Sequence, residues 1–322
     1  MLTDNKITKQ IESYIEFKQS LGYQLKTESQ ELRRFARFTR EIIGHCGSLT
    51  VDLAMQWATL DCNFSRWYMA RRLETVHTFA VYAASIDPQA QIPPTGVFGK
   101  CHGRVTPYIY TEEEILRLMT MSKNLLSTDG IRRMTVSTAI GLLWSTGIRV
   151  SELTNLKVKD VNFKDEYLYI RNTKFHKDRL VPLHNTTLEQ LKEYDTELRG
   201  KLLERSEDHF FFVNTNGRRF NLRAFEYAFQ RLRPCLLPAG ENKWNRRPPR
   251  LYDIRHSFAC RTILKWLEAG ENVNQKVYLL SVYMGHVKPA DTYWYLTSTP
   301  ELLSLACSKF ELLYGKEMQP YE

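Results

Sequence analysis

Two tyrosines, Tyr293 and Tyr295, stand two residues apart in the segment GHVKPADTYWYL, residues 285–296, shortly after a Gly-His pair. A tyrosine hydroxyl can act as a nucleophile when a nearby group accepts its proton or when the site is strongly positive. Pro289 can begin a helix here, and two residues along a helix correspond to about 200°, so the two side chains face nearly opposite ways. Only one of them can therefore share a site with His286. The alternative interpretation of the segment is the aromatic face of a buried helix.

The segment STGIRVSELTNLKVKDV, residues 145–161, places an arginine where one helix ends and another begins. A buried helix over 137–147 is expected to stop at Gly147, Arg149 follows at once, and Ser151 can cap the next helix. An arginine in such a junction can be held rigidly. Without further context, an arginine on the surface is the simpler interpretation.

The segment RPPRLYDIRHSFACR, residues 247–261, combines basic residues with an apolar helix face. The apolar stripe consists of Leu251, Ile254, Phe258 and Ala259. Tyr252 and Arg255, three residues apart, share one face of this helix, and His256 lies next to that face. An arginine and a histidine on an otherwise apolar helix indicate anion binding, with a buried ion pair as the alternative.

Several enzyme classes are disfavoured by motifs that the chain lacks. The sequence has no GxxxxGK, GxGxxG, HExxH or GxSxG motif. Its eight histidines show no metal-ligand spacing. We therefore predict neither a metalloenzyme nor a nucleotide-driven machine, and no metal or other cofactor.

Composition and charge give weaker indications. The net charge of +9 favours a polyanionic partner only weakly, since many basic proteins bind no nucleic acid. The six cysteines are scattered without a CxxC motif, which is typical of reduced thiols. The chain has neither a signal-peptide pattern nor an apolar run of membrane-spanning length. We expect a soluble, cytoplasmic protein with no membrane association.

The chain length predicts about two domains. Residues 1–86 show helical periodicity throughout, for example in Ile7, Ile11 and Ile15, and the basic residues on the other faces fit a solvated surface better than a DNA-facing one. Residues 87–109 are rich in Pro and Gly and are predicted to be a linker. Thr111 is a plausible N-cap of the first helix of a second region, 110–322.

The second region mixes helices with a short β-hairpin. EYLYIRN alternates Leu168 and Ile170 with Tyr167 and Tyr169, and DRLVPLH follows it, so 166–184 is predicted to be a hairpin with NTKFHK at its turn. Further helices are expected over roughly 186–199, 221–235, 253–269, 273–284 and 299–314.

Together these segments resemble the tyrosine recombinases, also called lambda-type integrases. TGIRVSEL is similar to the family's first arginine box, DIRHSFA to the second, and YMGHVKPADTYWYL to the box with the Gly-His pair and the nucleophile. IRNTKFHKDRLVPL resembles the hairpin that carries the family's catalytic lysine, and the motifs together span 107–314 in the family's order. The implied fold is mainly α with a small antiparallel β-sheet (α+β). A helical core-binding (SAM-like) DNA-binding domain over 1–86 would precede a tyrosine-recombinase catalytic domain over 110–322.

The resemblance assigns roles position by position. The residues matched to catalytic positions are Arg149, Lys174, Arg255, His286 and Tyr295. Tyr295 is matched because the family's nucleophile lies nine residues after the histidine of the Gly-His pair, which makes Tyr293 a packing residue. Lys177 is the alternative to Lys174. Glu152 matches the acidic residue three positions after the first arginine, and His256 is assigned a supporting role.

Tyr252 departs from the family pattern, which usually has a histidine three residues before the second arginine. A tyrosine can donate a hydrogen bond to a phosphate oxygen, but the ordinary tyrosine pKa of about 10 makes it a poor proton shuttle at neutral pH. We therefore keep Tyr252 as a catalytic-site residue but do not transfer the histidine's role in proton transfer to it.

The implied chemistry is cleavage and rejoining of DNA through a covalent 3′-phosphotyrosine. Arg149 and Arg255 would neutralise the charge that develops on the attacked phosphodiester, and Lys174 would protonate the leaving 5′-oxygen. The covalent intermediate conserves the bond energy, so the reaction needs neither ATP nor a metal. The predicted function is a site-specific DNA recombinase or integrase of a mobile genetic element.

The implied partner is double-stranded DNA. Candidate phosphate contacts are Arg218, Arg219, Lys243, Arg246, Arg247 and Arg250. By analogy with the family, the helix at 299–314 would dock onto a neighbouring protomer, which predicts a homo-tetramer on two DNA sites and a nucleoid-associated location.

Two alternative functions remain open at this stage. A type IB topoisomerase shares the same residue logic but would relax supercoils without site dependence. A catalytically inactive DNA-binding regulator is favoured only by Tyr252.

Overall fold

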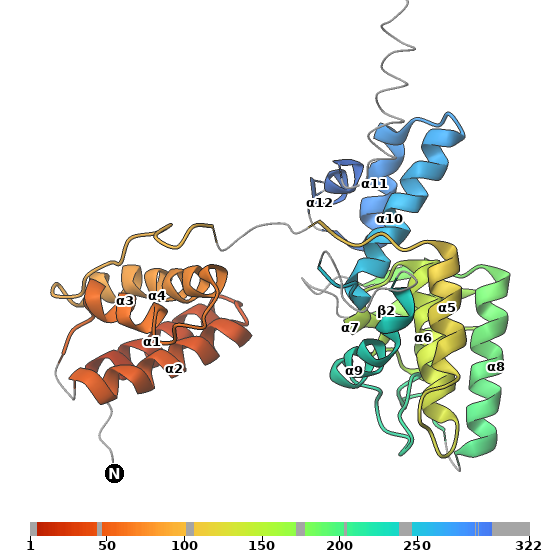
Figure 1. The fold of residues 1–322 in the computed structure, drawn as a ribbon, viewed down its shortest axis with the longest axis horizontal. Coiled ribbons are helices and arrows are strands. Elements are labelled where there is room, and N and C mark those ends of the chain that lie inside the picture. Colours follow the sequence, from red (N-terminus) through yellow and green to blue (C-terminus); the bar gives the residue numbers. More distant parts are fainter. Residues whose placement is uncertain are drawn as a thin grey trace, which may run out of the picture. The chain divides into compact units, whose positions relative to one another are not determined.

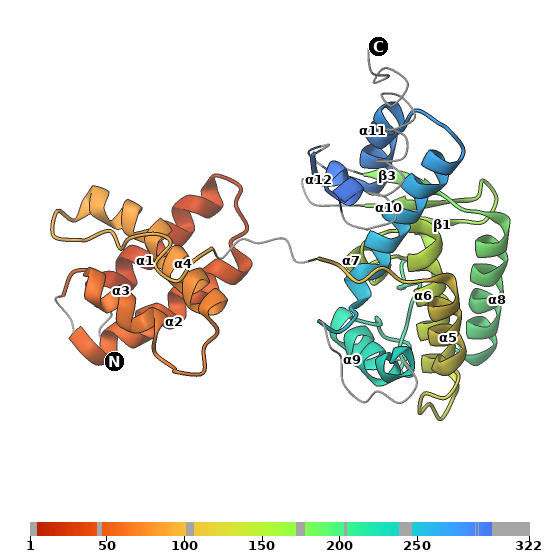
Figure 2. The ribbon, with the colours of Figure 1, turned by 45° about the horizontal axis from the view of Figure 1, so that its top comes forward.

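The structure is a computed structural model that describes residues 5–43, 47–100, 106–171, 178–202, 205–237, 247–286, 288 and 290–297 (Figures 1 and 2). The chain divides into two compact units, Met1–Val105 and Thr106–Glu322. Within the described residues, no helix is both long enough and apolar enough to cross a membrane. Lys174, Lys243, Arg246 and the predicted helix at 299–314 lie outside the described residues.

The first unit is helical in its described part, as its periodicity predicts. It contains α1 (Lys6–Ser20), α2 (Lys26–Ile43), α3 (Val51–Ala58) and α4 (Arg66–Ile86). The side chains of Asn5, Thr50 and Ser65 each accept a hydrogen bond from a backbone N–H in the first turn of the helix that follows. The predicted stripe of Ile7, Ile11 and Ile15 is buried among the four helices.

Most of the expected linker packs on this first unit. The backbone N–H of Gln91 donates to the carbonyl of Leu49 at 2.8 Å, and the carbonyl of Pro93 lies 2.7 Å from Nδ1 of His77. At the other end, Tyr110 belongs to the second unit, where its N–H donates to Oγ of Ser257 at 2.8 Å. The division between the units falls after Val105, well beyond the end of α4.

In its described residues, the second unit combines helices with one small sheet (Figure 1). Its α-helices are α5 (Glu112–Ser122), α6 (Ile131–Thr146), α7 (Val150–Leu153), α8 (Asn185–Lys201), α9 (Leu222–Leu232), α10 (Leu251–Glu268), α11 (Val273–Met284) and α12 (Ala290–Tyr293). Short 3₁₀ helices are η1 (Val158–Asp160), η2 (Arg233–Leu236) and η3 (Trp294–Thr297). The predicted cap at Thr111 is confirmed, because its side chain and that of Glu114 form a reciprocal capping box.

The two strands of the predicted hairpin are confirmed in a three-stranded antiparallel sheet in the order β1 (Val161–Asn162), β2 (Tyr167–Ile170) and β3 (Arg179–Pro182). The predicted turn NTKFHK lies outside the described residues. Leu168 lies opposite Val181, and both are fully buried. The alternation in the sequence therefore gives the correct inward face. The fold as a whole is mainly helical with a small antiparallel sheet, as expected.

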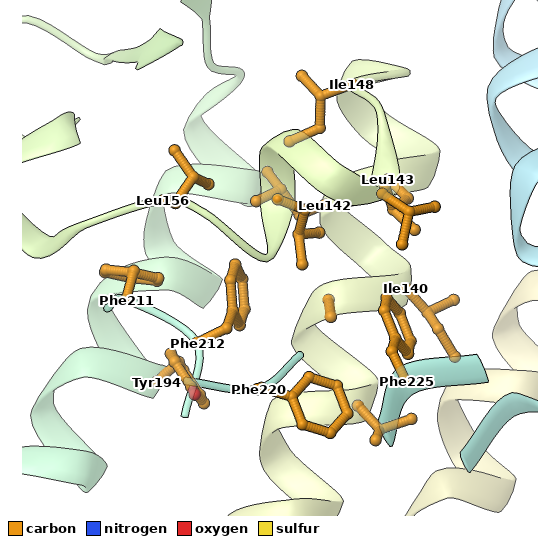
Figure 3. Close-up of a cluster of buried hydrophobic side chains, with 14 of the residues drawn as sticks. Ile140, Leu142, Leu143, Ile148, Leu156, Tyr194, Phe211, Phe212, Phe220 and Phe225 are labelled. Carbon is orange, nitrogen blue, oxygen red and sulfur yellow. The ribbon is translucent and has the colours of Figure 1, made fainter. Parts of the chain in front are cut away.

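Two apolar cores lie within the described residues of the second unit. The larger core surrounds α6, which packs against both α5 and α8. In Figure 3, Phe225 lies beside the α6 residue Ile140, whereas Phe211 lies at the opposite edge of the cluster, near Leu156. The smaller core joins α10, α11 and η3 through Ala259, Cys260, Ile263, Leu280, Met284 and Tyr295. One of the two candidate nucleophiles thus belongs to a packed core.

Candidate active site

Arg149 is held at the junction that the sequence predicts. Helix α6 ends at Gly147, whose φ of 62° is the left-handed conformation that glycine adopts most readily. Arg149 itself is the N-cap of α7, and Ser151 lies inside that helix, so the predicted capping role of Ser151 was wrong. Nη1 of Arg149 donates to Oε1 of Glu152 at 2.7 Å, and Nη2 donates to the carbonyl of Gly285 at 2.8 Å. Since an arginine side chain has five N–H donors, these two contacts leave donors for a ligand.

Glu152 is the anionic centre of this arrangement. Its carboxylate accepts hydrogen bonds from the backbone and side chain of Arg149 and two more from Arg179, at 3.0 and 2.7 Å. Burial alone would raise the pKa of this carboxyl, but the two arginines outweigh that effect and lower the pKa to about 2. Glu152 is therefore ionised at neutral pH.

Arg255 lies in the interior, at 5% exposure, on α10. Nη1 donates to the carbonyl of Gly147 at 2.7 Å, and Nη2 donates to the carbonyl of Met284 at 2.6 Å. Burial lowers the pKa of this guanidinium to about 10, so it stays cationic at neutral pH. The contacts with Gly147 and Met284 tie the ends of α6 and α11 to α10.

His286 follows Gly285, which ends α11 with a φ of 67°. Nη2 of Arg255 lies 3.1 Å from Nε2 of His286, and Oγ1 of Thr292 lies 2.7 Å from Nδ1. Because the arginine can only donate, Nε2 accepts and Nδ1 carries the proton of a neutral ring. Burial and the positive charge of Arg255 lower the pKa of His286 to about 4, in agreement with this neutral state.

The two tyrosines separate as their spacing predicts. Tyr295 is only 4% exposed, whereas Tyr293 is 43% exposed. The Tyr295 ring lies 5.4 Å from that of His256 and 6.0 Å from that of His286, measured between ring centroids. Burial raises the pKa of the Tyr295 hydroxyl, while the nearby Arg255 opposes the shift. Tyr295 is therefore the tyrosine that shares a site with His286 and Arg255.

A cleft of about 720 Å³ opens beside Arg149. Glu152, Tyr252, Lys157, Lys159 and Arg171 are among its lining residues. Tyr252 is 51% exposed, so its hydroxyl is accessible to a molecule that enters the cleft. The lining lysines and Arg171 are paired with Asp208 and Asp160.

Comparison with known proteins decides the family. Residues 109–301 match the phage integrase family. The protein y4rB of Sinorhizobium fredii, named as an integrase/recombinase, is 34% identical over 304 residues, which cover 94% of this chain and 96% of y4rB. The chain belongs to the phage integrase family of tyrosine recombinases. It is thus an enzyme of DNA strand cleavage and rejoining, as the resemblance implies.

Other relatives and solved structures agree with this membership. The recombinase is 27% identical to tyrosine recombinase XerD of Staphylococcus haemolyticus over 75% of each chain. Its fold matches the Tn1549 transposon integrase in complex with transposon right end DNA, with a TM-score of 0.67, 16% identity and coverage of 95% of this chain and 99% of that chain. It also matches the XerH site-specific recombinase bound to palindromic difH substrate, with a TM-score of 0.64, 16% identity and coverage of 97% of this chain and 91% of that chain.

The candidate DNA contacts differ in how free their side chains are. Arg218 and Arg247 of the recombinase are exposed. Nε of Arg219 donates to the carbonyl of Thr154 at 2.9 Å. Nη2 of Arg250 donates to Asp253 at 2.7 Å. Arg219 and Arg250 therefore have partners within the protein that a phosphate would have to share.

Two residues of the recombinase site were missed in the sequence. Arg179 pairs with Glu152, and the buried Thr292 orients His286. Arg179 had a weak signal, because it is the second residue of the predicted strand DRLVPLH. Thr292 had none, since nothing in a lone threonine six residues after a histidine indicates a ring contact.

Proposed function

We propose that the recombinase cuts one DNA strand by attack of Tyr295 on a backbone phosphate and then rejoins the end to another 5′-hydroxyl. The observation that carries this proposal is the convergence of Arg149, Arg255 and His286 on the turn at residues 284–286, with the Tyr295 ring beside them. Two fixed guanidiniums and an imidazole beside a tyrosine form a site for a phosphodiester and its nucleophile.

The two arginines act on the charge of the transition state. Attack on phosphorus places negative charge on the non-bridging oxygens, which accept hydrogen bonds from guanidinium N–H groups that are already in position. The neutral ring of His286 adds a polar contact at the same place. An arriving phosphate anion raises the pKa of His286 and so favours a ring that donates to an oxygen.

Proton transfer completes the reaction. As the phosphorus–Tyr295 oxygen bond forms, the hydroxyl proton of Tyr295 passes to water. The bond from phosphorus to the 5′-oxygen breaks, and Lys174 gives that oxygen its proton. Tyr252, which faces the cleft, donates a hydrogen bond to the phosphate in place of the family's usual histidine. The 3′-phosphotyrosine retains the bond energy, and attack by a new 5′-hydroxyl reverses the steps.

The DNA partner and the assembly follow from the same analogy. Domain 1–86 and the catalytic region 110–322 would hold the duplex, with Arg218 and Arg247 as the exposed phosphate contacts. The helix at 299–314 would join protomers into a tetramer on two sites. Because its relatives include a transposon integrase and proteins named as integrases, we assign the recombinase to a mobile genetic element.

The test is a covalent trap. The wild type, Tyr295→Phe and Tyr293→Phe are each expressed with the DNA of the native host present. After denaturation the protein is purified and any attached DNA is sequenced. We expect adducts in the wild type and Tyr293→Phe but not in Tyr295→Phe, and the attached DNA then identifies the target site.

The Tyr293 variant is the matched control, because it removes the same hydroxyl two residues away. Adducts lost only in Tyr293→Phe would mean that the nucleophile is assigned incorrectly. A wild type that binds DNA without forming any adduct would favour the catalytically inactive regulator.

A further inference from the structure

Arg179, which was not among the predicted site residues, donates to the site through its whole guanidinium. It is the first residue of β3, and its side chain is only 11% exposed. Nη1 and Nη2 donate to the two oxygens of Glu152 at 3.0 and 2.7 Å, and Nε donates to the carbonyl of Tyr283 at 2.8 Å. All three nitrogens of the guanidinium are thus engaged by the site.

These contacts close a ring of interactions. Arg179 holds Glu152, Glu152 holds Arg149, and Arg149 holds the carbonyl of Gly285. Gly285 in turn lies against Arg179, since a Cβ added to it would stand only 3.0 Å from Nη1. The ring joins β3, α7 and the end of α11, which are far apart in the sequence.

The ring also determines the charge that a phosphate meets. Arg149, Arg179 and Arg255 are cationic and Glu152 is anionic, so the group carries two net positive charges. Without Arg179, Glu152 would be left to pair with Arg149 alone, and only one net positive charge would remain. Moreover, a carboxylate with free lone pairs would compete with the phosphate for the N–H groups of Arg149.

We propose that Arg179 is a positioning residue that takes up both oxygens of Glu152 and so leaves the guanidinium of Arg149 available to the scissile phosphate. It also holds the turn at Gly285 against that guanidinium. The proposal rests on the proposed function of the site. Arg179 itself makes no contact with the substrate and acts through Glu152, Arg149 and the turn at Gly285.

The alternative is that Arg179 only stabilises the fold. The two possibilities differ in a double variant. Arg179→Gln lowers the charge of the group, whereas Arg179→Gln combined with Glu152→Gln restores two net positive charges while removing the ion pair. If Arg179 only stabilises the fold, replacing Glu152 as well does not restore the activity. If Arg179 acts through the charge of the group, the second replacement does restore it.

The experiment measures single-turnover cleavage of a nicked duplex that carries the site recovered in the covalent trap, at saturating DNA. Removing one transition-state donor lowers enzymatic rates by about 10²–10³-fold. Arg179→Gln leaves Arg149 in place and weakens only its contact with the phosphate. We therefore expect the cleavage rate to fall about 10-fold or more in Arg179→Gln and to recover to within about threefold of the wild type in the double variant. Arg179→Lys keeps the positive charge but loses the bidentate contact with Glu152. Its cleavage rate should lie between those of Arg179→Gln and the double variant.

Arg205→Gln is the matched control. Arg205 is also a buried arginine whose Nη1 donates to a carboxylate, Asp195, at 2.7 Å, but its Nη2 donates to the backbone carbonyls of Phe210 and Phe211 rather than to a residue of the ring. This variant should lower thermal stability and leave the cleavage rate of the folded protein unchanged. Equal rates in Arg179→Gln and the wild type would overturn the proposal, as would a double variant no faster than Arg179→Gln.

Two further measurements keep this test separate from the proposed function. Tyr295→Phe is run on the same duplex, and cleavage in that variant would overturn the proposed function without bearing on Arg179. Binding of inorganic phosphate, followed by its effect on the melting temperature, needs no cleavage at all. We expect the half-saturating phosphate concentration to rise about 10-fold in Arg179→Gln and to return to the wild-type value in the double variant. An unchanged concentration in Arg179→Gln would also overturn the proposal.

Discussion

Gly147→Ala tests whether the end of α6 is as tightly packed as the site requires. A Cβ at this position would lie 2.3 Å from Cδ1 and 2.6 Å from Cγ of Phe258, and the backbone φ of 62° is unfavourable for alanine. The conformation costs about 1–2 kcal/mol and the overlap about 1–3 kcal/mol more. We therefore expect a loss of roughly 2–5 kcal/mol in the free energy of unfolding.

Gly270→Ala is the control for the conformational part of this loss. Gly270 has a φ of 71° beyond the end of α10, and a Cβ there would meet nothing within 4 Å. Gly270→Ala should therefore lower the free energy of unfolding only by the conformational cost. Urea unfolding of the full chain then gives the overlap as the difference between the two variants, about 1–3 kcal/mol.

Cleavage activity gives the second half of this test. The carbonyl of Gly147 accepts the hydrogen bond from Nη1 of Arg255, so any shift that relieves the overlap with Phe258 also moves this arginine. Folded Gly147→Ala should cleave DNA more slowly than folded Gly270→Ala. Equal unfolding midpoints for the two variants would refute the packing argument, and equal cleavage rates would refute its link to Arg255.

Three further predictions concern the same unit. The pKa of His286 is about 4 in the folded protein, whereas that of a histidine in the unfolded chain is about 6.5. Between these values the unfolded chain binds more protons, so the free energy of unfolding should rise with pH from about 4 to 6.5. The gain is about 1–2 kcal/mol after allowance for the partial exposure of the ring, and urea unfolding should show it in the wild type but not in His286→Asn. Tyr252→Phe should slow cleavage about 10-fold, whereas Tyr252→His should cleave at least as fast as the wild type with a new pH dependence near neutrality, measured as single-turnover rates. Phe212→Ala removes a fully buried ring and should cost about 3–5 kcal/mol by urea unfolding, whereas a loss below about 1 kcal/mol would contradict the packing in Figure 3.

Local patterns in the sequence predicted the features that depend on near neighbours. Alternation placed Leu168 on the buried face of β2, and the glycines at 147 and 285 end α6 and α11. The spacing of Tyr293 and Tyr295 placed them on opposite sides, one exposed and one buried. Each of these is fixed by backbone geometry within a few residues, which is why the pattern was sufficient.

The partners of charged side chains were beyond such patterns. A basic residue looks the same in a sequence whether its side chain is exposed, like that of Arg218, or donates to an acceptor within the protein, as Arg219 does to Thr154. The contact between Arg179 and Glu152 spans 27 positions, and the contact between Arg179 and Tyr283 spans 104. Such pairs arise only when the tertiary fold brings distant elements together. The packing of 90–93 on the first unit was missed for the same reason.

The ends of two helices explain how three guanidiniums can stand so close together. Arg255 donates to the carbonyl of Gly147 at the end of α6, and carbonyls at the end of α11 accept from Arg255, Arg179 and Arg149. The last carbonyls of a helix lack partners within the helix and carry its partial negative charge, so they offset the mutual repulsion of the arginines. The glycine that ends each helix lets the chain turn away and leaves these carbonyls facing the site. A phosphate that enters therefore meets cations already fixed in place, which need no further reorganisation when charge develops on its oxygens.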